Sequence, residues 1–126
     1  MAVSQLRSKR KATGGLYKSY RKKKLYELGN SPLFVKLGER KIKVKRVRGG
    51  NIKVRLLTEK KVNVALPDGK SKVVEIAKIK ANPANRNYVI RNFITKGTIV
   101  ETELGDVLIT SRPSQEGTLN GRLIKE

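Results

Sequence analysis

Residues 42–56 read IKVKRVRGGNIKVRL, and this stretch sets the pattern for the rest of the chain. Apolar and basic residues alternate on both sides of Gly49-Gly50-Asn51. A two-residue period is typical of a β-strand, and a Gly pair followed by Asn favours a turn. The stretch therefore predicts a β-hairpin with apolar residues on one face and cations on the other. The cations of the predicted outward face are Lys43, Lys45, Lys53 and Arg55.

Short strand patterns of the same kind recur toward the C-terminus at intervals of about ten residues. Two of them are joined by Pro67-Asp68-Gly69, which is a strong turn signal, and two by Leu104-Gly105. The patterns lie at 62–66, 73–79, 99–103, 107–110 and 119–124.

One segment between these strands departs from the alternation. Asn82 can cap a helix and Pro83 suits a first helical turn, which predicts a short helix from Pro83 to about Asn92. A strand over 88–94, or a helix passing into a strand, remains open. The fold class expected is mainly β: six to eight short antiparallel strands in a barrel-like sheet, one short helix and a basic, extended N-terminal arm.

The first 29 residues have almost no hydrophobic periodicity but many cations. We expect an extended arm that is ordered only on a partner, because apolar burial here cannot offset roughly 1–2 kcal/mol of backbone ordering entropy per residue. The alternative is a solvated tail. Tyr17, Tyr20 and Tyr26 lie among the cations, and we expect them to stack on bases or sugars. Residues 17–28 are also candidates for a short helix formed on binding.

The net charge indicates which class of partner the chain binds. Thirty Lys and Arg face ten Asp and Glu, a net charge of +20. Residues 1–55 hold 18 cations against two acids (+16), whereas residues 98–126 hold three against five (−2). A chain with this imbalance is most naturally neutralised by a polyanion. The Gly14-Gly15 and Gly49-Gly50 pairs fit either a close approach to phosphate or a plain flexible turn.

Several function classes lack the residues that they need. The chain contains no Cys and no His, so we expect no metal, no cofactor and no enzymatic activity. No phosphate-loop motif and no apolar run near the roughly 20 residues of a membrane span occur. Glu101, Glu103, Asp106 and Glu116 lie close in sequence without a nucleophile beside them. Arg112 fits either a phosphate contact or a salt bridge to a nearby acid.

Several ordered segments resemble the family of small-subunit ribosomal protein eight of the archaeal and eukaryotic type. The most specific are 11–15 (KATGG), 27–32 (ELGNSP) and 46–56 (RVRGGNIKVRL), continued by 82–85 (NPAN), 94–97 (ITKG) and 110–113 (TSRP). The length resembles the archaeal form. The resemblance implies a β-barrel-like body with a basic extension, direct contact with ribosomal RNA and no enzymatic activity.

Together these observations predict an arm and linker at 1–38, ordered on RNA, and an RNA-binding body at 39–126. The expected function is structural, in the small ribosomal subunit of the cytoplasm, with ribosomal RNA and neighbouring ribosomal proteins as partners and neither a membrane nor a small-molecule substrate. A DNA-compacting, chromatin-type protein is the alternative. The predicted RNA-binding residues are Arg7, Lys9, Arg10, Lys11, Gly14, Gly15, Tyr17, Lys18, Tyr20, Arg21, Lys22, Lys23, Lys24, Lys43, Lys45, Arg46, Arg48, Lys53, Arg55, Arg86, Arg91 and Arg112.

Overall fold

The computed structural model describes residues 7–124, so the ends of the predicted arm and body (1–6 and 125–126) lie outside the described residues. The chain divides into two compact units, one reaching to Pro32 and the other starting at Leu33. The first contains one short 3-10 helix, η1 (Leu25–Glu27). The second contains all the strands, and its first strand lies inside the 1–38 range that the sequence assigns to the arm and linker.

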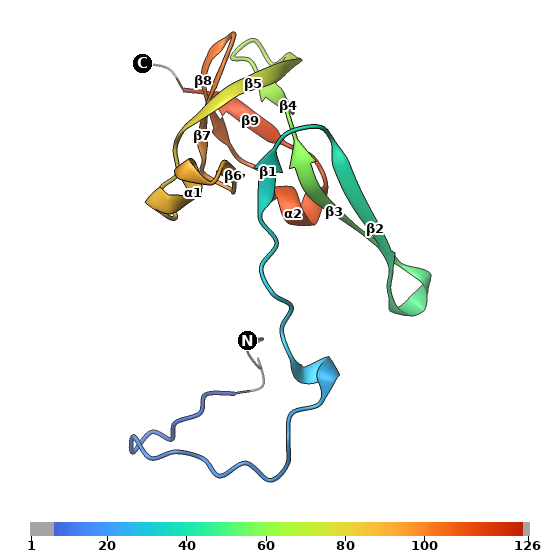
Figure 1. Cartoon of the computed structure of the whole chain (residues 1–126), viewed down its shortest axis with the longest axis vertical. Helices are drawn as coiled ribbons and strands as arrows, with labels where there is room; N and C mark the ends of the chain where they lie inside the picture. Colours follow the sequence, from blue (N-terminus) through green and yellow to red (C-terminus); the bar gives the residue numbers. More distant parts are fainter. Residues whose placement is uncertain (1–6, 125–126) are drawn as a thin grey trace. The chain divides into compact units, whose positions relative to one another are not determined.

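Five strands of the second unit close into a barrel in the order β4-β5-β7-β8-β9 (Figure 1). Neighbouring strands run antiparallel except β4 and β9, which pair in parallel through 63–65 and 120–122 and so close the barrel. Their bounds are β4 (Lys61–Ala65), β5 (Ser71–Ala81), β7 (Ile99–Thr102), β8 (Gly105–Ile109) and β9 (Asn120–Leu123).

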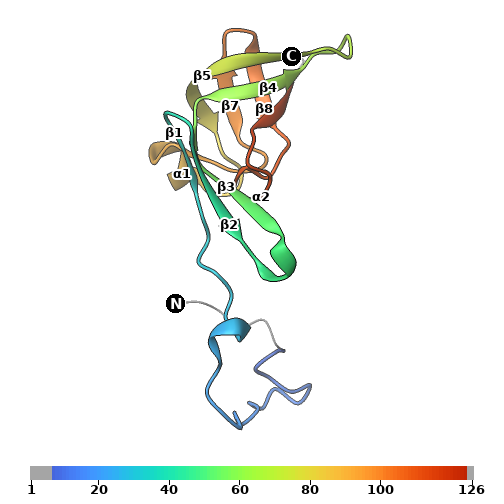
Figure 2. The same ribbon diagram turned by 90° about the vertical axis from the view of Figure 1, so that its right-hand side faces the viewer.

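The other four strands form a second sheet in the order β2-β3-β1-β6. In this sheet β1 and β3 are parallel, and the remaining pairs are antiparallel. Figures 1 and 2 both show β2 and β3 projecting from the barrel as a hairpin, with η2 (Arg48–Gly50) at its tip. The bounds are β1 (Val35–Leu37), β2 (Lys41–Arg46), β3 (Ile52–Glu59) and β6 (Phe93–Ile94).

One hydrophobic core serves both sheets because alternate residues of each strand point inward. In β4, for example, Val62 and Val64 are fully buried while their neighbours are exposed. Leu56, Val35 and Ile94 bring the second sheet into the same cluster. The mainly β, barrel-like fold is thus confirmed, and both predicted turns join strands: 66–70 between β4 and β5, and 103–104 between β7 and β8.

Three details differ from the sequence-based expectations. The described residues form nine strands with two parallel pairs, where only antiparallel neighbours were expected. A second short helix, α2 (Pro113–Glu116), forms in addition to the one that was expected. The apolar face of the β2–β3 hairpin is covered only in part. Gly117, which ends α2, lies against Val54, whereas Val44 is 61% and Ile52 is 66% exposed.

The segment after β5 is a helix that passes into a strand, one of the three alternatives. The helix α1 (Arg86–Ile90) starts later than expected, because its cap is Asn85, whose Oδ1 accepts from the Asn87 amide at 2.9 Å. Asn82 is instead buried. Its Nδ2 donates to Thr95 Oγ1 and Thr98 Oγ1, both at 3.0 Å, and so ties the end of β5 to the β6–β7 connection.

Candidate nucleic-acid interface

The first unit is densely cationic. Residues 7–32 contain nine Lys and Arg and one acid, Glu27. All nine cations belong to the predicted site, and eight of them are exposed; Arg21 is half-buried. Such a segment gains by displacing counterions from a polyanion.

A small hairpin shapes the start of this arm. The Tyr17 amide donates to the Lys9 carbonyl at 3.0 Å, and the Lys11 amide donates to the Gly15 carbonyl at 2.8 Å. Gly14 has a φ of 84°, the left-handed conformation that a three-residue hairpin loop needs at this position. The Gly14-Gly15 pair therefore forms a defined turn, and we call residues 9–17 the arm hairpin.

The tyrosines of the arm lie against its cations. The Arg7 guanidinium carbon is 3.9 Å from the Tyr17 ring centroid, and the Lys11 ammonium is 5.7 Å away. Lys24 lies 5.9 Å from the Tyr26 ring centroid in the same way, and the Tyr20 ring has Arg21 at 5.0 Å. These cation–π contacts hold the cations in clusters along the arm. Stacking of the tyrosines on bases or sugars stays a prediction.

Glu27 is used inside the arm. Its Oε2 accepts from Arg21 Nη1 at 2.9 Å and from the Lys24 amide at 3.0 Å, which fixes the bend at η1. Hydrogen bonding from Arg21 holds the pKa of the Glu27 carboxyl below its usual value and raises the pKa of the Arg21 guanidinium. Glu27 therefore neutralises Arg21, and the other eight described cations of the arm take part in none of the ion pairs of residues 7–124.

In the second unit, like charges face one another across the β2–β3 hairpin. Lys43 lies opposite Arg55, and Lys45 lies opposite Lys53. Directly opposed like charges destabilise a strand pair unless a counter-charge is bound. The five ion pairs found in residues 7–124 use other cations: Arg21, Arg40, Lys60, Lys78 and Lys80.

The barrel treats its lysines differently. Lys60 Nζ lies 2.6 Å from Glu75 Oε2, and this contact raises the pKa of Lys60 and lowers that of Glu75. Lys78 pairs with Glu101 and Lys80 with Asp106. Two of the four acids that lie close in sequence, Glu101 and Asp106, therefore neutralise barrel cations, and no group of potential metal ligands occurs among the described residues.

The remaining predicted residues occupy separate elements. Arg48 lies in η2 at the hairpin tip, and Arg46 pairs with Ile52 and so lies on the apolar face. Arg86 begins α1 and Arg91 caps its C-terminus, both exposed. Arg112 precedes α2, and its Nη1 donates to Gln115 Oε1 at 3.3 Å. Arg112 takes part in none of the ion pairs of residues 7–124, so the structure does not contain the salt bridge given as an alternative.

Two exposed lysines of the second sheet, Lys41 and Lys36, were not among the predicted RNA-binding residues. Lys41 begins β2 and continues the every-second-residue spacing of Lys43 and Lys45, which was a usable signal. Lys36 lies 5.7 Å from the Phe93 ring centroid, and Phe93 stacks on Phe34 at 4.9 Å between centroids. No local pattern in the sequence pointed to Lys36, because the Phe34 and Phe93 rings of this cluster come from segments that are far apart along the chain.

Comparison with known proteins gives one consistent result. The family described as ribosomal protein S8e matches residues 4–124. The chain is similar to proteins named small ribosomal subunit protein eS8: 53% identical to that of Nanoarchaeum equitans, over 96% of both chains, and 48% to that of Methanobrevibacter smithii, over 98% of this chain and 100% of the relative. It is 47% identical to that of Staphylothermus marinus over the full length of both. No helix in 7–124 is long and apolar enough to cross a membrane.

Proposed function

The chain belongs to the ribosomal protein S8e family, and from this membership we propose that it is a structural component of the small ribosomal subunit that binds ribosomal RNA through its arm and its β2–β3 hairpin. Its relatives are named as small-subunit proteins, which supports the same placement in the cytoplasm beside RNA and other ribosomal proteins. No chemical step is part of the function.

The observation that carries the proposal is the unequal treatment of cations on one folded unit. Of the lysines around the barrel, Lys60, Lys78 and Lys80 pair with acids of the same chain, and Lys61 and Lys72 lie opposite Glu75 and Val64 rather than another cation. The hairpin cations instead oppose one another, so the fold concentrates positive charge there at a cost to its own stability. Phosphates of RNA supply the missing counter-charge.

The arm extends this contact in a different form. A turn is already present at 11–15, and cation–π contacts gather Arg7 and Lys11 around Tyr17. Partial order of this kind lowers the entropy that must be lost when the arm is fixed on RNA. Binding is dominated by counterion release and by the shape of the RNA, because A-form RNA hides its base edges in a narrow groove.

Salt titration of RNA binding tests the hairpin contact. The triple variant Lys43→Gln, Lys45→Gln, Lys53→Gln is compared with Lys61→Gln, Lys70→Gln, Lys72→Gln, which removes the same charge from exposed lysines of the barrel, taking the net charge from +20 to +17 in both. Full-length protein making about eight phosphate contacts has a slope of log K against log salt of roughly −6 to −7.

We expect the hairpin variant to flatten that slope by roughly 2 and the barrel variant to leave it nearly unchanged. Small-subunit RNA and duplex DNA are titrated in parallel. Equal slopes for the two variants would remove the hairpin from the interface, and equal affinity for DNA and RNA would favour a general polyanion-binding protein over the proposed function.

A further inference from the structure

An apolar hollow lies at the end of the barrel away from the hairpin tip. It lies between the β4–β5 turn, the β7–β8 turn and β9, and its volume is about 740 Å³. Figures 1 and 2 show these turns and the tip of the β2–β3 hairpin at opposite ends of the second unit. The side chains that matter to the argument are Leu66, Leu104, Leu108, Arg122, Leu123 and Ile124.

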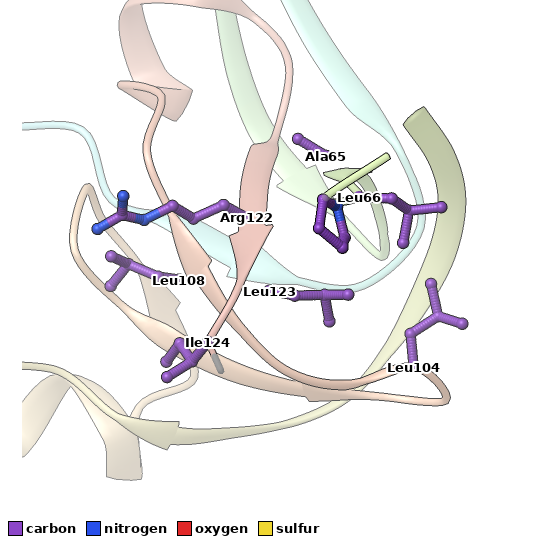
Figure 3. A pocket seen from close by; sticks show the side chains of 8 residues that line it. Ala65, Leu66, Leu104, Leu108, Arg122, Leu123 and Ile124 are labelled. Atoms are coloured by element: carbon purple, nitrogen blue, oxygen red, sulfur yellow. The ribbon is translucent and has the colours of Figure 1, made fainter. Parts of the chain in front are cut away.

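Seven of the eight residues that line the hollow are apolar, and the eighth is Arg122. Figure 3 shows Leu66 and Leu104 on one side and the Arg122 guanidinium beside Leu108 on the other. Arg122 is exposed and belongs to none of the ion pairs found in residues 7–124. The turns that carry Leu66 and Leu104 also hold two exposed acids, Asp68 and Glu103, and one exposed base, Lys70.

We propose that this hollow is the docking site of a protein segment in the small subunit, with aliphatic side chains against the apolar lining and an acid against Arg122. Burial of apolar surface supplies the affinity, and the ion pair with Arg122 fixes the position of the segment. Arginine beside apolar side chains is a common centre of protein interfaces.

The charge around the hollow argues against RNA as the occupant. The described lining holds one cation, Arg122, and the two adjoining turns hold Asp68, Glu103 and Lys70, so the charges balance, whereas the described part of the arm holds nine cations against one acid. A polyanion gains little from a surface with no positive excess, and phosphate does not match a leucine-lined floor. The molecule thus presents RNA with one end of this unit and protein with the other.

A photo-crosslinking residue placed at Leu108 in small subunits assembled with the full chain tests this directly. A probe at Val73 is the matched control, because Val73 is an exposed apolar residue of β5, 59% accessible, that does not line the hollow. We expect the Leu108 probe to join a neighbouring protein, at a peptide with adjacent aliphatic and acidic residues, in yield about tenfold above the Val73 probe. The proposal is overturned if the Leu108 probe cross-links to RNA or to a second copy of this chain. It is also overturned if the yield at Leu108 is no higher than at Val73.

A second measurement separates this proposal from the proposed function on which it rests. The Leu108→Ser, Ile124→Ser variant is tested for binding to protein-free small-subunit RNA and for incorporation into subunits that carry the other proteins. We expect unchanged binding to bare RNA and about tenfold poorer incorporation. Loss of binding to bare RNA assigns the hollow to RNA and refutes the docking site, while failure of unaltered protein to bind RNA refutes the proposed function instead.

Discussion

Lys45 and Lys53 face one another across the β2–β3 hairpin, both exposed, with no acid on either strand between residues 41 and 58. A substitution that removes this repulsion is therefore expected to stabilise the free protein but to weaken its binding to RNA. Lys45→Glu turns a repulsive pair into an attractive one, which raises the free energy of unfolding by roughly 0.5 kcal/mol. It also places a carboxylate where a phosphate is expected, so RNA affinity falls.

Thermal unfolding at low salt, read beside RNA titration, checks this pair of effects. The expected rise in melting temperature is on the order of 2–4 °C. Lys72→Glu is the control, because Lys72 is exposed on β5 and lies opposite Val64 rather than another cation. If both variants change stability and affinity alike, the opposed lysines have no special role.

Removal of residues 1–29 leaves a folded body with weaker, less salt-dependent binding. Within residues 7–124, every residue of the buried core lies from Val35 to Leu119, so the melting temperature of the truncated protein stays near that of the full chain. The truncation removes the nine cations of the arm. The slope of log K against log salt therefore flattens by several units, since each lost phosphate contact reduces it by about 0.7–0.9. Unfolding of the truncated protein, or an unchanged slope, contradicts the prediction.

Acid releases the bend at η1. Arg21 lowers the pKa of Glu27 in the folded arm, so the stabilisation is present above the carboxyl's unfolded pKa and is lost as pH falls through the folded pKa. Carboxyl NMR titration of Glu27 should give a midpoint below about 4.3, the ordinary value for Glu. The Arg21→Gln variant should bring the midpoint back toward that value, and a midpoint that does not move rules out the ion pair.

Replacement of Gly117 by alanine destabilises the contact between α2 and β3. Its φ of 77° disfavours any side chain, and an added Cβ would lie 2.7 Å from Val54 Cγ1. Gly69→Ala is the matched control, because Gly69 has a φ of 76° with open space around it. Urea unfolding should show a loss of about 1 kcal/mol for Gly69→Ala and about 2–4 kcal/mol for Gly117→Ala. Equal losses would mean that α2 does not pack on Val54.

The buried amide of Asn82 supports the start of α1. Asn82→Ala leaves Thr95 and Thr98 without their shared partner and should lower the free energy of unfolding by about 1–3 kcal/mol. Asn85→Ala removes only an exposed helix cap and should cost about 1 kcal/mol. Urea unfolding of the two variants measures the difference, and a smaller loss for Asn82 than for Asn85 would contradict this assignment.

Local patterns in the sequence were enough to predict most of the strands. Alternation placed Val62 and Val64 correctly toward a core, because a strand with one buried face must repeat every second residue. The same rule named the opposed cations of the hairpin. It could not say that Val44 and Ile52 stay exposed, since alternation identifies a face but not what covers it.

What the sequence could not predict depends on contacts between distant segments. The parallel pairing of β1 with β3 and of β4 with β9 joins strands whose register no local signal records. Both Asn82 and Asn85 fit a helix cap, and only the presence of Thr95 and Thr98 beside Asn82 decides between them. The second short helix, α2, was not predicted, because a short helix and a turn can begin with the same residues, such as Pro113.

The parallel pairing of β4 with β9 has a consequence for how a new chain matures. Strand β9 also pairs with β8, so the ring of strands has a gap until β9 leaves the exit tunnel of the translating ribosome. The cationic leader emerges long before that point. The cations of a nascent chain are therefore accessible to any nearby polyanion while its hydrophobic interior is still exposed. A chaperone that shields the cationic leader or the open barrel would have to bind during this interval.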